Sequence, residues 1–107
     1  MTGSLAHYMD LLSARQKLVA SNIANVDTPG YKSKDIDFES EFLSLAQGQA
    51  PNAIETPGLT TKSDGNNVDI DRESRLLAEN AIRFNVASNL ARAQLTLVRN
   101  AIEEGGK

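Results

Sequence analysis

Apolar residues near the amino terminus recur at the spacing of an α-helix. The positions that define the pattern are seven residues apart: Leu5, Leu12, Val19 and Val26. Residues seven apart share one face of a helix, because the helix has about 3.6 residues per turn. The pattern predicts an amphipathic helix over residues 4–26, with Ser4 as its N-cap.

A longer helical pattern covers residues 70–104. Two rows of positions recur every seven residues, and most of their members are apolar: Ile70, Leu77, Phe84, Ala91 and Val98, then Ser74, Ala81, Ser88, Leu95 and Ile102. Such a seam is typical of a helix that packs lengthwise on another helix. Asp69 or Asp71 is expected to cap its start, and Gly105 and Gly106 its end. The helix would be roughly 50 Å long at about 1.5 Å per residue.

The segment between these helices has a weaker pattern. The string "DFESEFLSLAQG" predicts a short helix over residues 38–47, with Asp37 as its cap and Gly48 as its terminator. Asp64 and Gly65 lie between two short Thr- and Val-bearing runs, which predicts a tight turn or a small hairpin.

The sequence as a whole predicts one mainly α unit over residues 1–107. Its terminal helices pair as a coiled-coil-like hairpin, and an irregular middle segment, residues 27–69, separates them. Two helices cannot enclose all their apolar side chains, and several lie off the seam of the second helix: Leu76, Val86, Leu90 and Leu97. Two coverings stay open for these residues, namely adjacent subunits or the middle segment folded back over them.

Composition adds two constraints. The chain has 107 residues, of which 40% are hydrophobic, but aromatic residues make up only 5% and Trp is absent. A chain this short buries a modest share of its surface even when compact, so its stability is expected to depend on neighbouring molecules. The formal net charge of −3 argues against a nucleic-acid-binding surface, which would carry clustered Lys and Arg.

Targeting signals of the common kinds are not apparent. No apolar run approaches the roughly 18 residues of a membrane span. The amino-terminal stretch "MTGSLAHYMDLL" lacks the basic start and long apolar centre of a cleaved secretory signal. If the protein leaves the cytoplasm, we expect it to use another route.

Candidate chemistry is sparse. His7 is the only histidine and Cys is absent, which leaves no thiolate chemistry. The string "DGNNVDID" does not match the twelve-residue calcium loop, which needs ligands at fixed positions and a closing Glu. No Gly-rich turn runs into Gly-Lys-Ser, as it does in a phosphate-binding loop. We therefore expect no catalytic, cofactor-binding or metal site.

The most specific stretch is "SNIANVDTPGYKSKD", residues 21–35. Asn25 is expected to end the first helix in the left-handed conformation that Asn tolerates. Pro29 and Gly30 suit the central positions of a type II turn, in which the second residue has a positive φ. Tyr31 then brings a hydroxyl that needs a partner. Together these residues specify one exit path from the helix.

Two interpretations of Asn22 and Asn25 stay open. In the first, they belong to a well-capped helix followed by an ordinary turn. In the second, two amides three residues apart on one helix face bond to loop or partner backbone at a packed contact.

The string "SNIANVDTPGYK" resembles the signature of bacterial flagellar axial proteins of the rod and hook family, nearly completely over residues 20–32. The strings "RQKLVASNIAN", "KDIDFESEF" and "DGNNVDIDRESRLLAENAIRFN" resemble rod proteins of the FlgB type. The FlgC type favours an Asn-Pro element, a Met-rich run and an Arg-Ala-Tyr-Glu-Ala-Asn string before its last helix, and these are absent here. The resemblance covers most of residues 13–105.

The resemblance implies a structural subunit of the proximal rod of the bacterial flagellar basal body. Such subunits are exported unfolded by the flagellar type III apparatus, without a cleaved signal, and stack into the rod that crosses the periplasm. The implied partners are copies of the same chain and other rod proteins, with the adaptor FliE, the FliF ring and the export gate at the proximal end. Neither nucleic acid nor a membrane span is implied.

Two sets of residues are expected to carry this assembly. The expected assembly motif consists of Ser21, Asn22, Ile23, Ala24, Asn25, Thr28, Pro29, Gly30 and Tyr31. The expected helix-packing seam consists of Leu5, Leu12, Val19, Ile70, Leu77, Ala81, Phe84, Leu95, Val98 and Ile102.

Two other functions stay open. A helical-hairpin secretion chaperone or adaptor would explain the seam and the acidic pI of about 5.0, but it gives no role to the Thr-Pro-Gly turn. A rod protein of the FlgC type is the second alternative.

Overall fold

The computed structural model describes residues 2–45 and 51–105. Its elements follow in the order α1 (Thr2–Ala24), β1 (Lys34–Asp35), α2 (Phe38–Leu45), β2 (Ile54–Glu55) and α3 (Ile70–Gly105). The predicted mainly α architecture, with paired terminal helices and a short helix between them, is confirmed.

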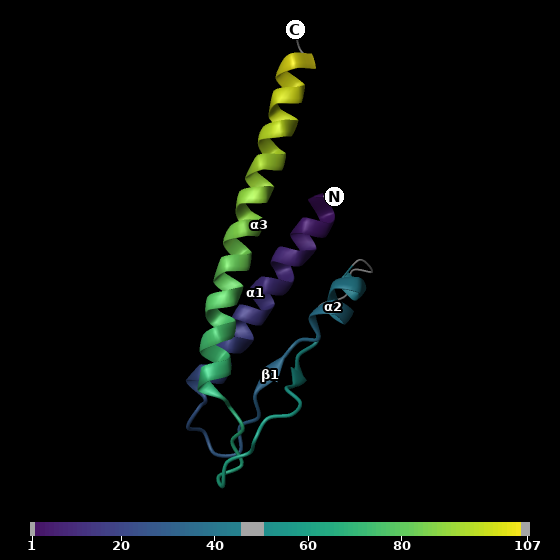
Figure 1. Ribbon diagram of the computed structural model, residues 1–107. Coiled ribbons are helices and arrows are strands. Elements are labelled where there is room, and N and C mark those ends of the chain that lie inside the picture. Colours follow the sequence, from purple (N-terminus) through teal and green to yellow (C-terminus); the bar gives the residue numbers. More distant parts are fainter. Residues whose placement is uncertain (1, 46–50, 106–107) are drawn as a thin grey trace.

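The terminal helices lie side by side and run in opposite directions (Figure 1), so that both chain ends point the same way. The middle segment gathers at the other end of the pair and along α1. The molecule measures 70 × 27 × 17 Å and has a radius of gyration of 18.0 Å. A compact chain of this length would have a radius of gyration of about 13 Å. The fold is therefore a rod that leaves much of its surface uncovered.

The helix starts follow local capping rules, with one exception. The Asp69 carboxylate accepts from the N–H groups of Asp71 and Arg72 at 3.1 and 3.2 Å, so Asp69 is the cap of α3. Asp37 likewise accepts from the N–H of Ser40 at 3.4 Å at the start of α2. Ser4, however, is not an N-cap, because α1 already begins at Thr2.

The helix ends agree less closely with the prediction. α1 ends at Ala24, two residues before the expected end, and α3 ends at Gly105 as expected. The predicted terminator Gly48 of the short helix lies outside the described residues, as does Gly106.

Strand pairing occurs at a different place from the predicted hairpin. β1 and β2 pair antiparallel, with Lys34 opposite Glu55 and Asp35 opposite Ile54. Asp64 and Gly65 lie in a tight turn with no strands on either side. The predicted tight turn is confirmed, and the hairpin is wrong because the chain after this turn goes directly into α3.

The apolar core is small and lies where α1 meets the middle segment. Leu11 and Ile36 are buried at its centre, and Leu18, Phe38 and Phe42 pack against them. Full burial of one such side chain contributes about 1.5–3 kcal/mol. This core therefore holds β1 and α2 on α1 but does not extend along α3.

α3 does not bury the face that its sequence predicts. Its buried residues are Glu73, Asn80 and Ala87, which are seven residues apart and so form one stripe. Asn80 donates from Nδ2 to the Leu12 carbonyl oxygen at 2.8 Å and to Gln16 Oε1 at 3.0 Å. At about 100° per residue, the predicted seam lies roughly 60° around the helix from this stripe.

The two halves of the predicted seam differ as a result. On α1, Leu12 and Val19 are buried and Leu5 is half-buried. On α3, the seam residues are exposed: Ile70, Leu77, Ala81, Phe84, Leu95, Val98 and Ile102. The pairing of the helices is confirmed, but within one chain α1 does not cover the α3 half of the seam.

The middle segment does not cover the remaining apolar residues of α3. α2 and β1 pack on α1. Val86, Leu90 and Leu97 are exposed, and only Leu76 is half-buried. For the described residues, the interpretation in which the middle segment folds back over this face is therefore wrong.

We expect the isolated chain in dilute solution to lose helix gradually on heating. Most of α3 has no tertiary cover, so its turns can unwind without disrupting the small core. Circular dichroism of a dilute monomer measures this loss. A sharp transition that coincides with the loss of tyrosine signal in the near ultraviolet would contradict the prediction.

Candidate functional site

The chain turns sharply after α1 at residues 28–31, which we call the corner. The N–H of Tyr31 donates to the carbonyl oxygen of Thr28 at 3.2 Å, so Pro29 and Gly30 occupy the central positions of a β-turn. Gly30 has a φ of +76°, as the second central position of a type II turn requires. A Cβ on Gly30 would meet nothing within 4 Å. Glycine is therefore needed here for its backbone conformation and not for space.

Asn22 links the last turns of α1 to the strand that follows the corner. Its side chain is fully buried. Its Nδ2 donates to the carbonyl oxygen of Lys34 at 2.8 Å, and its Oδ1 accepts from the N–H of Lys34 at 3.0 Å. One side-chain amide thus satisfies both main-chain groups of Lys34, as a neighbouring strand would. The interpretation of this amide as a bond to loop backbone at a packed contact is confirmed.

Asn25 ends α1 in a different way from the predicted one. No described residue other than glycine has a positive φ, so the left-handed conformation is wrong. Instead, Asn25 Nδ2 donates to the Ser21 carbonyl oxygen at 2.8 Å, and its Oδ1 accepts from the Thr28 hydroxyl at 3.0 Å. The side chain itself satisfies a carbonyl of the last turn, which removes the need for a left-handed residue.

The Tyr31 hydroxyl returns to α1. It donates to Asn22 Oδ1 at 3.1 Å, and the Ser21 hydroxyl lies 3.1 Å from it. Because the only proton of the Tyr31 hydroxyl is used in the first bond, Ser21 is the donor in the second. The expected partner of this hydroxyl is therefore the helix that precedes it. Of the other motif residues, Ile23 is half-buried, and Ala24 is exposed.

A second turn, residues 62–67, packs against the corner, and we call it the facing loop. The N–H of Gly30 donates to the carbonyl oxygen of Asp64 at 2.9 Å. Gly65 has a φ of +87°, and a Cβ built on it would lie 3.2 Å from Gly30 Cα. Glycine at this position is thus required both by its conformation and by the close approach of the two backbones.

Asn66 and Asn67 hold the facing loop in place. Asn66 is fully buried, and its Nδ2 donates to the carbonyl oxygens of Asn25 and Thr28 at 2.9 and 2.8 Å. Asn67 Oδ1 accepts from the N–H of Ser33 at 2.6 Å. Neither residue is in the predicted motif. The signal that points to them is a pair of adjacent amides directly after an Asp-Gly turn.

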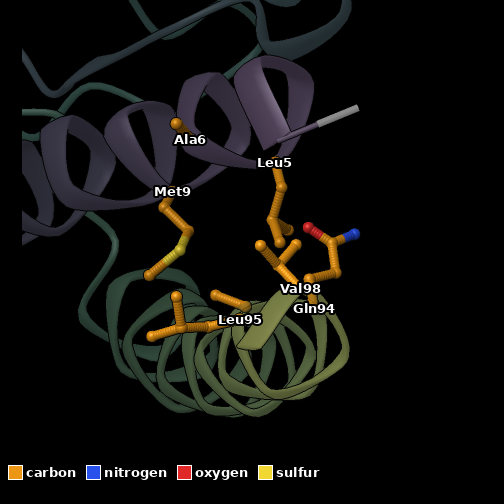
Figure 2. A pocket seen from close by; sticks show the side chains of 7 residues that line it. Leu5, Ala6, Met9, Gln94, Leu95 and Val98 are labelled. Carbon is orange, nitrogen blue, oxygen red and sulfur yellow. The ribbon is translucent and has the colours of Figure 1, made fainter. Parts of the chain in front are cut away.

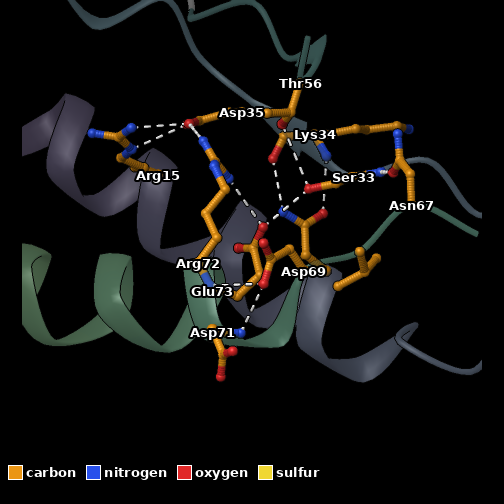
Figure 3. A network of polar contacts seen from close by, with 12 residues as sticks. Arg15, Ser33, Lys34, Asp35, Thr56, Asn67, Asp69, Asp71, Arg72 and Glu73 are labelled. Atoms are coloured by element: carbon orange, nitrogen blue, oxygen red, sulfur yellow. Dashed lines mark hydrogen bonds and ion pairs between the residues drawn. The ribbon is translucent and has the colours of Figure 1, made fainter. Parts of the chain in front are cut away.

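A cluster of charges beside the corner joins α1, β1 and α3 (Figure 3). Arg15 of α1 donates to both carboxylate oxygens of Asp35, at 3.0 Å from Nε and 2.9 Å from Nη2. Arg72, in the first turn of α3, donates to the same carboxylate at 2.7 Å. These three residues are also outside the predicted motif. They lie 20 and 37 positions apart in the sequence, so no local pattern connects them.

The carboxyl group of Asp35 is held in its charged form. Burial alone would raise its pKa, because burial disfavours the carboxylate. The hydrogen bonds from Arg15, Arg72 and the N–H of Ile36 outweigh burial, and the pKa of Asp35 lies below its ordinary value of 3.8. The cluster therefore contributes stability above about pH 3.8, and this contribution is lost as the pH falls through the lower folded-state pKa.

Glu73 is the second buried carboxylate of this region, with no exposed side-chain surface. Its Oε1 accepts from the Ser33 hydroxyl at 3.0 Å and from Arg72 Nη1 at 3.1 Å. Its Oε2 has no hydrogen-bond partner among the described residues. Glu73 thus ties the first turn of α3 to the segment after the corner, although one of its oxygens is desolvated without compensation.

Two hollows between the helices bring parts of the predicted seam together. The first, of about 320 Å³, lies near the start of α1, where Leu5 faces Leu95 and Val98 (Figure 2). The second, of about 450 Å³, lies further along, where Leu12 is near Phe84. Seam residues of the two helices therefore face each other across open hollows and do not pack closely.

Residues 2–45 and 51–105 offer neither a metal site nor a membrane-spanning helix. They hold no group of three or more acidic, His or Cys side chains that could bind a metal ion. None of their helices is long and apolar enough to cross a membrane.

Comparison with known proteins assigns the corner to a family. Residues 9–32 match the family described as Flagella basal body rod protein. The flagellar basal body rod protein FlgB of Borrelia hermsii is 36% identical over 84% of this chain and 87% of its own length. The protein chain belongs to the FlgB family. FlgB of Escherichia coli strain K12 is 30% identical over 91% of this chain, and FlgB of Borreliella burgdorferi is 31% identical over 78%.

The matched segment has a clear structural meaning in this FlgB-family chain. Residues 9–32 contain the buried face of α1, the paired amide of Asn22 and the whole corner. The relatives match far beyond it, over the middle segment and α3. The residues that match the family therefore form one side of a packed contact. β1 and the facing loop form the other side.

We expect Asn22→Ala to open the contact between α1 and β1. The N–H and carbonyl of Lys34 would lose their partners, at about 1–3 kcal/mol for a buried unsatisfied group. The amide of Lys34 should then exchange with solvent roughly 5- to 150-fold faster in hydrogen-exchange NMR. Asn100→Ala, at an exposed position of α3, is the control. Unchanged protection of Lys34 in the Asn22 variant would contradict the assigned bond.

We expect Arg15→Gln to raise the pKa of Asp35. The substitution removes a charged bidentate donor while burial, which favours the neutral form, remains. Carbon-13 NMR of the Asp35 carboxyl during an acid titration measures the change. Arg83→Gln is the control, because Arg83 pairs with Glu79 on the exposed surface. Equal midpoints for wild type and Arg15→Gln would refute the role of this guanidinium.

Proposed function

We propose that this protein is a structural subunit of the proximal rod of the bacterial flagellar basal body. The corner is the observation that carries the proposal. Together with Asn22 and the facing loop, the corner fixes the direction in which the chain leaves α1, and Gly30 provides its positive φ. The corner also lies within the segment that matches the rod family. The named FlgB relatives, which cover most of the chain, support the same function.

The surface of the helix pair fits a subunit whose neighbours complete it. Seven seam residues of α3 are exposed, and hollows lie on the helix pair where a well-packed hairpin would have none. Further copies of this chain or other rod proteins are the partners that we expect on these surfaces. Contacts with FliE, the FliF ring and the export gate belong to the same proposal, and so do a periplasmic location and export without a cleaved signal.

The protein as proposed is not an enzyme. At the base of the helices, the buried side chains of Asn22 and Asn67 bond to main chain and serve to position backbone. The buried Ser33 hydroxyl bonds to Glu73. A secretion chaperone of the helical-hairpin type is less well supported, because it gives no role to the corner. The FlgC type is less well supported because the named relatives are FlgB proteins.

Deletion of the gene tests the proposal in the bacterium that carries it. Cells without the gene should not swim and should lack a rod, and the wild-type gene should restore both. Electron microscopy of purified basal bodies detects the rod, and labelled protein should lie at its proximal end. Swimming cells that lack the gene would refute the proposal.

We expect Gly30→Val to fail in the same complementation assay. A β-branched residue at a φ of +76° is strained by a kcal/mol or more, so the corner would lose its conformation. Gly58→Val is a matched control: Gly58 has a φ of +77°, and its Cβ would also meet nothing within 4 Å. Secretion assays of both variants separate a defect in assembly from one in export. Full motility with Gly30→Val would contradict the role of the corner.

A further inference from the structure

One side of α3 carries an apolar row that no residue of the described segments, 2–45 and 51–105, covers. Its members are Ile82, Val86, Leu90 and Leu97, whose exposed fractions are 65%, 62%, 47% and 69%. The row lies beside and behind the buried stripe of Glu73, Asn80 and Ala87: at about 100° per residue, Leu90 is roughly 60° around the helix from Ala87, and Ile82 roughly 160° from Asn80. We call the apolar row and its flanking residues the back face.

Charge is distributed unevenly along the back face. Its end nearest the corner carries Arg75 together with Glu79, whose charge is paired with Arg83 at 3.0 Å, so the net charge of this end is positive; its far end carries Glu104. Arg75 and Glu104 are exposed, and both lie on the same side of the helix as the apolar row. The small residue Ala93 lies on this face between Val86 and Leu97. The back face therefore has a basic end, an apolar centre and an acidic end.

We propose that two copies of this chain pair through the back faces of their α3 helices in antiparallel orientation. A two-fold axis between Asn89 and Leu90 sets the register. It places Arg75 of one copy opposite Glu104 of the second, and it places Ile82 opposite Leu97. The same register places Val86 opposite Ala93, so a branched side chain meets a small one at the centre of the contact.

Charge decides the orientation of the pair. In a parallel, in-register pair, Arg75 would face Arg75 and Glu104 would face Glu104, which is repulsive at both ends. The antiparallel pair has an attractive contact at both ends and buries the same apolar row. An exposed ion pair is weak by itself, but the same pair occurs twice in a two-fold dimer.

Such a dimer has a consequence for assembly, which rests on the proposed function. A two-fold contact closes on itself, whereas a filament requires contacts that repeat in one direction. The antiparallel pair therefore covers the back face outside the rod and must separate before the chain joins it. The dimer itself does not depend on the rod function.

Charge reversal tests the orientation, with the full chain and sedimentation velocity as the measurement. Arg75→Glu and Glu104→Arg alone should each weaken the dimer about tenfold or more, because both ends become repulsive. An equimolar mixture of the two variants should recover it, because every end is then attractive again. Leu97→Ser should also remove the dimer, while Leu43→Ser, which is 67% exposed on α2, should not.

Single cysteines give a second test, and the chain has no cysteine of its own. Leu90→Cys lies next to the axis and should form a disulfide with its own copy on mild oxidation. Ile82→Cys should form none with itself but should cross-link to Leu97→Cys in a mixture. A monomer at all accessible concentrations would overturn the inference, and so would self-cross-linking of Ile82→Cys, which indicates a parallel pair. Neither result would affect the gene-deletion test of the rod function.

Discussion

The buried amide of Asn22 is the contact on which the lower half of the molecule depends. Its two hydrogen bonds to Lys34 fix the strand that carries Asp35 and Ile36 at a set position along α1. Ile36 then packs on Leu11, and Asp35 meets Arg15. Since a side-chain amide offers one donor and one acceptor side by side, no apolar residue at this position could align the strand in the same way.

The charges of Arg15, Asp35 and Arg72 act on geometry more than on stability. Replacement of a buried ion cluster by apolar residues is often neutral or stabilising, so its presence is weak evidence for added stability. A bidentate guanidinium–carboxylate pair forms only in a narrow range of directions, and Arg15 is bound to Asp35 in this way. Arg72 donates one bond to the same carboxylate and a second bond to Glu73. The cluster thereby fixes the direction in which α3 leaves the base of the molecule.

Those features that a few adjacent residues determine could be predicted from the sequence. The turn at Pro29 and Gly30 follows from the φ values that these two residues favour. Asp69, one of the two expected caps of α3, has a short side chain whose carboxylate accepts from the N–H groups two and three residues later. The pairing of the terminal helices followed from their period. The predicted left-handed conformation of Asn25 is wrong because the Asn25 side chain itself donates to the Ser21 carbonyl oxygen. A left-handed residue at the helix end would otherwise let the main chain satisfy such a carbonyl.

Features that depend on distant contacts were not predictable in this way. α3 carries apolar residues around most of its circumference, so its period gives the spacing of a seam but not the side that meets α1. The choice is made by Asn80, a polar residue whose amide bonds to Leu12 and Gln16 across the helix pair. The adjacent amides after the Asp-Gly turn draw attention to Asn66, but they do not predict its partners, which lie 38 and 41 positions earlier in the chain.

The length of α3 gives the base of the molecule a mechanical importance. This helix of 36 residues is about 54 Å long, while α1 has only 23 residues to support it. Acting as a lever, it would move its tip by about 5 Å for a tilt of roughly 5° at its root. A small change in the tilt of α3 at its first turn, near Arg72, thus becomes a large displacement at the other end of the helix. The hydrogen bonds at the first turn therefore keep the position of that far end the same from one molecule to the next.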